Sequence, residues 1–229
     1  MLHEVLFVRY SGGALKPMED AALAQLCAAT ELPDWSVRVL DNWTRNENLS
    51  VIWNELIGES RAIHVTLLNS DCFVAPGWDA PILAAMHAHP RIGAAGPCAN
   101  QGPQAQLQPG NVSLPGALPS PGELARAARL CREQNAGIVK DVHPYGFCLT
   151  LRREAWLDAG KFNPEIPLYG NEDDLLRRMR ARAWRTAVIG DSYAWHRGGA
   201  SAAVAARAGR LDIEAARAAG RKALEQAGD

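Results

Sequence analysis

Short apolar runs alternate along the chain with segments whose apolar residues recur at helical spacing. Residues 4–8 (EVLFV) and residues 65–68 each predict a buried strand, and the segment WSVRVLDN, which stops at Asp41, predicts another strand. Between them, residues 19–29 and the segment LSVIWNELIGES predict two helices, the second ending near Gly58. Strands that alternate with helices are typical of βαβ units, so the pattern predicts an α/β protein built on a largely parallel sheet.

The alternation continues in the second half of the chain. The segment GELARAARLCREQN predicts a helix, VHPYGFCLTLRREAW a strand followed by a helix, and TAVIGDSYAWHRGG a last short strand. A helix is also predicted in NEDDLLRRMRARAW, with Asn171 as its N-cap. Residues 100–122, crowded with Pro, Gly and Gln, predict a long mobile loop. The Ala- and Arg-rich residues 201–228 predict a helical tail that packs on the outside or on a partner.

The composition is typical of one compact domain and indicates no specialised binding surface. At 229 residues the chain can bury one large core or at most two small ones. Its 24 Lys and Arg nearly cancel its 25 Asp and Glu, which indicates neither a nucleic-acid nor a membrane surface. Five scattered cysteines without metal-ligand spacing indicate a reduced cytosol. We expect no signal peptide and no transmembrane segment, because no apolar run approaches the length of a span.

Carboxylates follow two of the predicted strands at the point where each strand ends. Asp41 and Asp71 each come directly after an apolar run. Ligands of such sheets bind at the carboxyl ends of the strands, where a pair of carboxylates suits a metal or a nucleotide. Asp, Asn and Ser also favour the turns that end strands, so position alone leaves both interpretations open.

Three acids in a row, Glu172, Asp173 and Asp174, fall in the first turn of a predicted helix. The helix dipole favours carboxylates there, which is a sufficient structural explanation. A general base would instead present an unpaired carboxylate into a cleft, near the hydroxyl whose proton it removes. Gly170 just before the acids allows a sharp turn, and the neighbouring Tyr169 could supply a stacking wall for a sugar.

The segment WHRGGAS follows the last predicted strand and contains His196 and Arg197 before two glycines. A lone histidine is more often a surface residue or a satisfied core residue than a ligand. Beside an arginine and two glycines, however, it belongs to a composition that can approach phosphate oxygens closely. With Asp71, His196 could complete the coordination of a divalent cation, and Mn²⁺ tolerates imidazole better than Mg²⁺ does.

The succession of these motifs resembles the inverting glycosyltransferases of family 2, in their rhamnosyltransferase-like branch. From residue 4 to residue 201 the order is LDN, NENLSVIWN, LLNSDCFVAPGW, RIGAAGP, GFCLTLRREAWLDAGKFNPEI, NEDDLLRRMRARAW and WHRGGAS. The resemblance implies a GT-A fold, with a Rossmann-like, mostly parallel sheet flanked by helices and an acceptor-side loop region. That domain would cover 1–201, with a nucleotide-sugar half over about 1–100, a flexible loop over about 100–122 and an acceptor and catalytic half over about 123–201. Residues 202–229 would form the helical tail.

The resemblance also implies a role for each motif. Asp71 would hold Mn²⁺ or Mg²⁺ as the last aspartate of the family's DxD element, and His196 would close the metal site. Asp173, with Glu172 before it, resembles the acid pair whose aspartate deprotonates the acceptor hydroxyl. Asp41 would read the nucleotide base. The nucleotide-sugar contacts implied are Tyr10, Ser11, Asp41, Asn46, Asn54, Asn69, Ser70, Gly146 and Arg197.

The implied activity is sugar transfer from a nucleoside-diphosphate sugar to an acceptor hydroxyl. A metal and Arg197 would stabilise the charge on the departing diphosphate, while Asp173 activates the acceptor oxygen from the opposite side of the ring, which inverts the anomeric centre. UDP, dTDP and GDP are the expected donors, and a glycan, lipid-linked, protein or small-molecule acceptor is expected in the cytoplasm or at the inner face of the membrane. A DNA acceptor is left open but not favoured, because duplex binding normally needs a basic face.

Two alternatives belong to other classes. A sugar-phosphate nucleotidyltransferase would explain SGGALKPM as part of a glycine-rich loop, but this loop lacks the longer Gly-x-Gly-x-Arg pattern and leaves NEDDL and HRGG without a role. A non-catalytic nucleotide-sugar-binding protein would be free to lose its base, and the retained Asp71, Asp173 and His196 argue against it.

Overall fold

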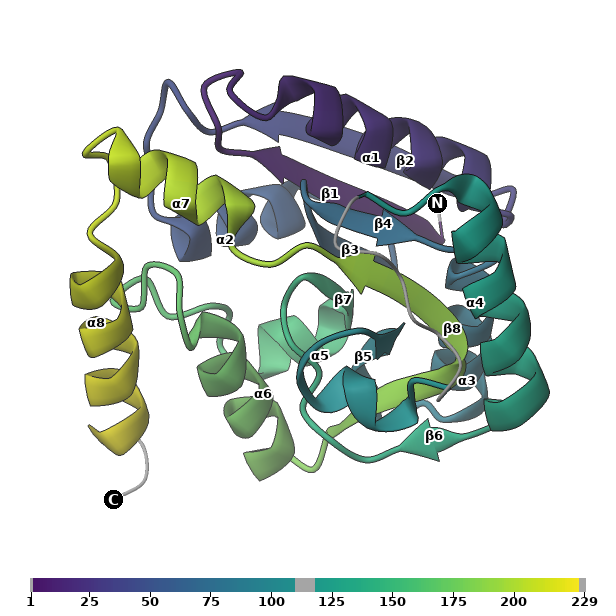
Figure 1. Ribbon diagram of the computed structural model, residues 1–229. Helices are drawn as coiled ribbons and strands as arrows, with labels where there is room; N and C mark the ends of the chain where they lie inside the picture. The colour runs from purple at the N-terminus through teal and green to yellow at the C-terminus, as the bar shows by residue number, and fades with distance from the viewer. Residues whose placement is uncertain (1, 110–117, 227–229) are drawn as a thin grey trace.

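The computed structural model describes residues 2–109 and 118–226 as one α/β unit (Figure 1). Its elements are β1 (His3–Arg9), α1 (Lys16–Ala29), β2 (Trp35–Asp41), α2 (Leu49–Glu59), β3 (His64–Asn69), β4 (Cys72–Val74), α3 (Asp79–Ala88), β5 (Ile92–Ala99), the 3-10 helix η1 (Gly102–Leu107), α4 (Pro121–Asn135), β6 (Val139–Lys140), β7 (Cys148–Arg152), α5 (Arg153–Asp158), α6 (Asn171–Ala181), β8 (Arg185–His196), α7 (Ala200–Arg207) and α8 (Ile213–Gln226). No helix in these described ranges has the length and apolar character needed to cross a membrane.

The strands form one mixed sheet in the order β2-β1-β3-β7-β5-β8-β4, with β6 paired to β8. Strands β2, β1 and β3 are parallel, and so are β5 and β8. Strand β7 runs antiparallel between β3 and β5, and β4 and β6 run antiparallel to β8. Five strands therefore share one direction and three run the other way. The predicted α/β fold is confirmed, and the three reversed strands are what the sequence pattern did not predict.

The core consists of two apolar layers, one on each face of the sheet. Side chains alternate between faces along a strand, so on β1 Val5 and Phe7 pack with α1, α3 and α4, whereas Leu6 and Val8 pack with α2, α5 and α6. This alternation explains why residues 5–8 (VLFV) are apolar throughout: both faces of β1 are buried there.

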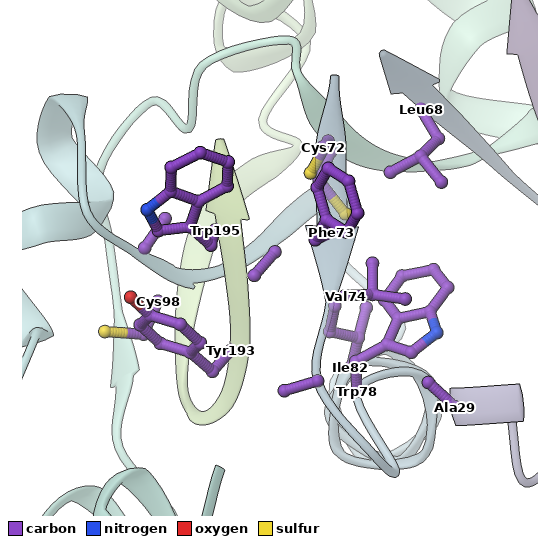
Figure 2. Packing of buried hydrophobic residues seen from close by; sticks show 14 of the residues in the cluster. Ala29, Leu68, Cys72, Phe73, Val74, Trp78, Ile82, Cys98, Tyr193 and Trp195 are labelled. Atoms are coloured by element: carbon purple, nitrogen blue, oxygen red, sulfur yellow. The ribbon is translucent and has the colours of Figure 1, made fainter. Parts of the chain in front are cut away.

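The strand directions gather five carboxyl ends on one edge of the sheet, hereafter the rim. The chain reverses in the turn at Ser70 and Asp71, so that β4 runs back antiparallel to β8 with Cys72 opposite His196. Figure 2 shows Phe73 of β4 and Trp195 of β8 on these neighbouring strands. Their ring centroids are 6.0 Å apart. This apolar pairing fixes the place of the rim residues that precede β4 and end β8.

Local differences from the sequence predictions have physical causes. Gly170, with φ 84°, is the N-cap of α6, so the prediction of Asn171 as the cap was wrong by one residue. A left-handed backbone there suits glycine, and Asn171 accepts a hydrogen bond from the Glu172 N–H inside the helix instead (2.9 Å). The prediction that α2 ends near Gly58 is confirmed, since its last residue is Glu59, whereas the last strand, β8, is long rather than short. The predicted loop at 100–122 contains η1, and its residues 110–117 lie outside the described ranges.

The tail folds back over the rim. After α7, helix α8 packs against α6, and its Gly220 approaches the carbonyl oxygen of Tyr169 so closely that a Cβ would lie 2.0 Å from that oxygen. The Arg177 guanidinium donates to the carbonyl of Leu224 (2.9 Å). Because glycine is the one residue that permits this approach, the position of α8 depends on Gly220.

We expect Gly220→Ala to displace α8. The added methyl group meets a backbone carbonyl that cannot rotate away, so the docked tail should lose about 1–3 kcal/mol. Limited proteolysis should then cut residues 208–226 faster than in the wild type. The matched control is Gly58→Ala, whose Cβ meets open space within a helix and should not destabilise the protein. Equal protease resistance of Gly220→Ala and the wild type would show that α8 is not held by this contact.

Candidate active site

A cavity of about 800 Å³ opens at the rim, within the size range of small-molecule sites. Its walls come from the ends of β1, β3 and β8, the loop after β2, the segment before β7, the start of α6, and the helices α7 and α8. Most of the predicted site residues line it: Tyr10, Asn46, Asn69, Ser70, Asp71, Gly146, Glu172, Asp173 and His196. The structure therefore brings together residues that are far apart in the sequence.

Asp71 and His196 face each other at the end of the β4–β8 pairing. The Asp71 Oδ1 lies 3.0 Å from the His196 Nε2, and its Oδ2 accepts a hydrogen bond from the Ala200 N–H (3.2 Å). Burial opposes ionisation of Asp71, but the bond to His196 and the Ala200 amide hold the pKa of this carboxyl below its usual range. The His196 ring stacks on Phe147 with centroids 4.5 Å apart, which fixes the plane of the imidazole.

The Asp71–His196 pair has the donor set and spacing of a two-ligand metal site. Two ligands 3.0 Å apart have the separation of neighbouring positions on an octahedral ion with bonds of about 2.1 Å. Within the described ranges, no three His, Cys, Asp or Glu side chains gather into a metal-binding group. A metal here would therefore have Asp71 and His196 as its acidic and imidazole ligands, with the remaining positions left to a substrate, as is usual for ions that bind phosphates.

Two amide side chains hold the backbone of His196. Asn100 accepts from the His196 N–H (2.8 Å) and donates to its carbonyl (2.9 Å), and Gln101 donates to the same carbonyl (2.7 Å). Neither residue was predicted from the sequence. Asn100 could have been predicted as a site residue, because it follows the apolar run of β5 just as Asn69 ends the apolar run of β3.

The three acids of α6 have different surroundings. Asp174 pairs with Arg178 one helical turn later and does not line the cavity, whereas Glu172 and Asp173 do. Glu172 Oε1 accepts from the Gly146 N–H (3.4 Å), and a Cβ on Gly146 would lie 3.2 Å from the Glu172 Cδ. Burial raises the pKa of Glu172 to about 7. Glu172 is therefore a carboxyl group that gains and loses its proton near neutral pH.

Tyr10 and Trp43 form an aromatic pair beside the cavity, in which Tyr10 lines the wall and Trp43 lies outside it. The Tyr10 ring lies 5.7 Å from the Trp43 ring, and the Tyr10 hydroxyl donates to Asn46. Arg210, from the segment between α7 and α8, contacts Trp43. Its guanidinium lies 4.4 Å from the centroid of the Trp43 ring and donates a hydrogen bond to the Trp43 carbonyl (2.7 Å). Asp41 is exposed, accepts from the Trp43 N–H (2.9 Å), and lies outside the cavity wall.

Three other predicted contacts also lie outside the cavity wall. Ser11 is buried at the turn before α1. The Asn54 amide pairs with the backbone N–H and carbonyl of Phe162 (2.9 and 2.8 Å), which anchors a loop. The Arg197 guanidinium approaches the Met18 sulfur (3.5 Å). Their roles in nucleotide binding stay predictions.

The tail contributes cavity residues that the sequence analysis did not predict. Six of them come from the segment before α8 and from α8 itself: Arg210, Leu211, Arg217, Gly220, Arg221 and Leu224. The available signal was the spacing of Arg217 and Arg221, four residues apart, on one face of a predicted helix.

Comparison with known proteins identifies the fold. No protein-family model and no curated protein sequence matches the chain. Similar structures are GalNAc-T7 with UDP, GalNAc and Mn²⁺ (TM-score 0.55, 13% identity, 86% of this chain and 44% of that chain) and residues 1–349 of S. aureus TarS (0.53, 13%, 86% and 60%). A third is the mannosyltransferase PcManGT from Pyrobaculum calidifontis with GDP-Man and Mn²⁺ (0.52, 13%, 85% and 56%). The chain has the GT-A fold of these glycosyltransferases, and it spans 44% to 60% of their length.

We expect Asn100→Ala to weaken metal binding by the Asp71–His196 pair by about 10- to 100-fold, as loss of an outer contact to a metal ligand does. The reason is that the His196 backbone loses two of its three amide bonds. Calorimetric titration with Mn²⁺ in the presence of a nucleoside diphosphate measures the effect. Gln25→Ala is the control, since it removes an amide bond to the Val74 carbonyl on β4 (3.0 Å) without touching His196. If Asn100→Ala binds Mn²⁺ as tightly as the wild type does, the Asn100 bonds to the His196 backbone do not support metal binding.

Proposed function

We propose that the protein is an inverting glycosyltransferase of family 2, in the rhamnosyltransferase-like branch, that moves a hexosyl or deoxyhexosyl group from a nucleotide sugar to an acceptor hydroxyl. The observation that carries the proposal is one cavity, in a GT-A fold, with the Asp71–His196 pair in one wall and the Glu172–Asp173 pair in another. Similar structures contain UDP or GDP-Man together with Mn²⁺, which supports the pairing of a nucleotide with a metal.

Asp71 and His196 would hold Mn²⁺ or Mg²⁺ at the donor diphosphate. When bound, such an ion neutralises the negative charge that develops on the departing phosphate. The Ala200 amide and the stacked Phe147 keep the two ligands oriented before any substrate enters, so little reorganisation is needed. The aromatic pair at Tyr10 and Trp43 would bind the base of the nucleotide, and Arg210 adds a positive charge at the same end.

Asp173 would remove the proton from the acceptor hydroxyl. It lies in the first turn of α6, on a different element from the metal pair, so leaving group and attacking oxygen can occupy opposite sides of the sugar ring. That arrangement supports a single displacement with inversion. Glu172, beside it, has a pKa of about 7. Loss of its proton near neutral pH would add a negative charge next to the acceptor hydroxyl.

The proposed domain organisation follows the same division. Residues 1–100 supply most of the nucleotide end, 123–201 the catalytic acids, and 202–229 the tail. We propose UDP, dTDP or GDP as the donor nucleotide and a glycan, lipid-linked, protein or small-molecule acceptor, in the cytoplasm or at the inner face of the membrane.

Nucleotide titration tests the proposal first. We expect one of UDP, dTDP and GDP to bind in the presence of Mn²⁺, and Asp71→Ala to weaken that binding by at least about tenfold, because the metal loses its acidic ligand. Isothermal calorimetry with each nucleotide, with and without Mn²⁺, measures both effects. The control is Asp141→Ala, since Asp141 is exposed and pairs with Arg185 away from the cavity. Failure of all three nucleotides to bind under any condition would overturn the donor assignment.

Substitution of the acids separates binding from catalysis. We expect Asp173→Asn to lower the rate of donor cleavage, with water or an added acceptor, by about 10²- to 10⁴-fold while the nucleotide affinity stays unchanged. The wild-type rate should rise with pH through about 7 as Glu172 ionises, and Glu172→Gln should remove that inflection. Nucleotide release measured from pH 5.5 to 8.5 reports both. A wild-type rate in Asp173→Asn would exclude Asp173 as the base.

A further inference from the structure

One face of α8 forms part of the cavity wall. Its cavity residues are Arg217, Gly220, Arg221 and Leu224, which follow the i, i+3, i+4, i+7 spacing of a single helical face. Ala216, beside them, is buried. Arg217, Arg221 and Lys222 are all exposed, and of these three Lys222 lies outside the cavity wall. The helix therefore contributes two arginines to the wall of a space that the proposed reaction uses.

This face lies at the acid-pair end of the cavity. Gly220 contacts the Tyr169 carbonyl, and the Arg217 guanidinium is 5.2 Å from the centre of the Tyr169 ring. Tyr169 directly precedes Gly170, the N-cap of α6, whose first turn holds Glu172 and Asp173. The nucleotide end is served by a different arginine, Arg210, on the Trp43 ring. Arg217 and Arg221 are thus placed beside the acceptor rather than beside the nucleotide base.

The two guanidinium groups are not neutralised by the cavity acids. The described residues contain no ion pair between Arg217 or Arg221 and either Glu172 or Asp173, and Arg221 has no carboxylate partner in the described part of the chain. The partner of Arg217 is Glu214, three residues earlier on the same helix (3.3 Å), and both side chains are exposed. An exposed pair of this kind contributes little and is readily exchanged for another anion.

We propose that the cavity face of α8 is a subsite for an oxyanion, a phosphate or carboxylate group carried by the acceptor, and that Arg217 and Arg221 bind it. Guanidinium groups present a planar fork of donors that matches two oxygens of phosphate or carboxylate. The assignment to the acceptor rests on the proposed function, whereas the oxyanion subsite itself does not. The protein would then select acceptors that carry negative charge near the hydroxyl to be glycosylated.

Anion titration tests the subsite without knowledge of the acceptor. Methyl phosphate and, separately, acetate are titrated into the protein, once without nucleotide and once saturated with the nucleoside diphosphate and Mg²⁺, and binding is followed by NMR of the arginine side chains. We expect at least one anion to bind in both states. The double variant Arg217→Ala, Arg221→Ala should raise its dissociation constant at least about tenfold, and the more strongly bound anion identifies the acceptor group as phosphate or carboxylate.

Controls separate the subsite from the donor site and from the fold. Lys222→Ala, a cation on the same helix but outside the cavity, should leave anion binding unchanged, and Arg221→Lys should retain part of it because the charge remains while the fork is lost. All variants should bind nucleotide as the wild type does.

Three outcomes would overturn the subsite: no anion binds, the double variant binds as the wild type does, or the nucleotide displaces the anion. The last would assign both arginines to the donor diphosphate. If no nucleotide binds to the wild type, the proposed function fails, and the nucleotide-free titration still decides whether α8 holds an oxyanion.

Discussion

The antiparallel pairing of β4 with β8 is the contact on which the candidate site depends. Residues 72–74 are buried and pair with residues 194–196, and the register puts Cys72 opposite His196. The carboxylate of Asp71, one residue before β4, is therefore held 3.0 Å from an imidazole that is 125 residues away in sequence. A polar pair of this kind would be costly inside an apolar core, and it is tolerated because it lies at the rim and faces a cavity.

Other contacts act on the same pair. Asn100 and Gln101, after β5, hold the backbone of His196, and the first amide of α7 binds the second oxygen of Asp71. The tail that begins at α7 then crosses the rim, places Arg210 on Trp43, and ends with α8 against the loop before α6. One continuous segment thus borders the Asp71–His196 pair, the Tyr10–Trp43 pair and the start of α6, so displacement of α8 would change that last part of the cavity while β4 and β8 stay in place.

The sequence predicted the positions of site residues that follow directly from the end of a strand. It was less informative about contacts that depend on long-range packing. Asp71 and His196 could be predicted to meet because each follows an apolar strand, and carboxyl ends of like-directed strands share an edge. The reversal of β4 and β7 could not, because alternation of apolar runs does not encode strand direction. The placement of Arg197 on Met18, and of Asn54 on Phe162, depends on rotamers and loop packing that composition does not fix. Helix α8 is the clearest case, since its docking rests on one glycine, Gly220, among alanines that look equivalent in sequence.

The role proposed for Asp71 and His196 is to bind a divalent metal at a nucleotide diphosphate. Diffraction at the manganese edge, from crystals grown with Mn²⁺ and the nucleoside diphosphate that binds best, tests it directly. We expect an anomalous peak in the rim cavity, from a manganese ion bonded to the Asp71 carboxylate, the His196 imidazole and diphosphate oxygens. A bound nucleotide with manganese elsewhere, or with no manganese at this pair, would contradict it.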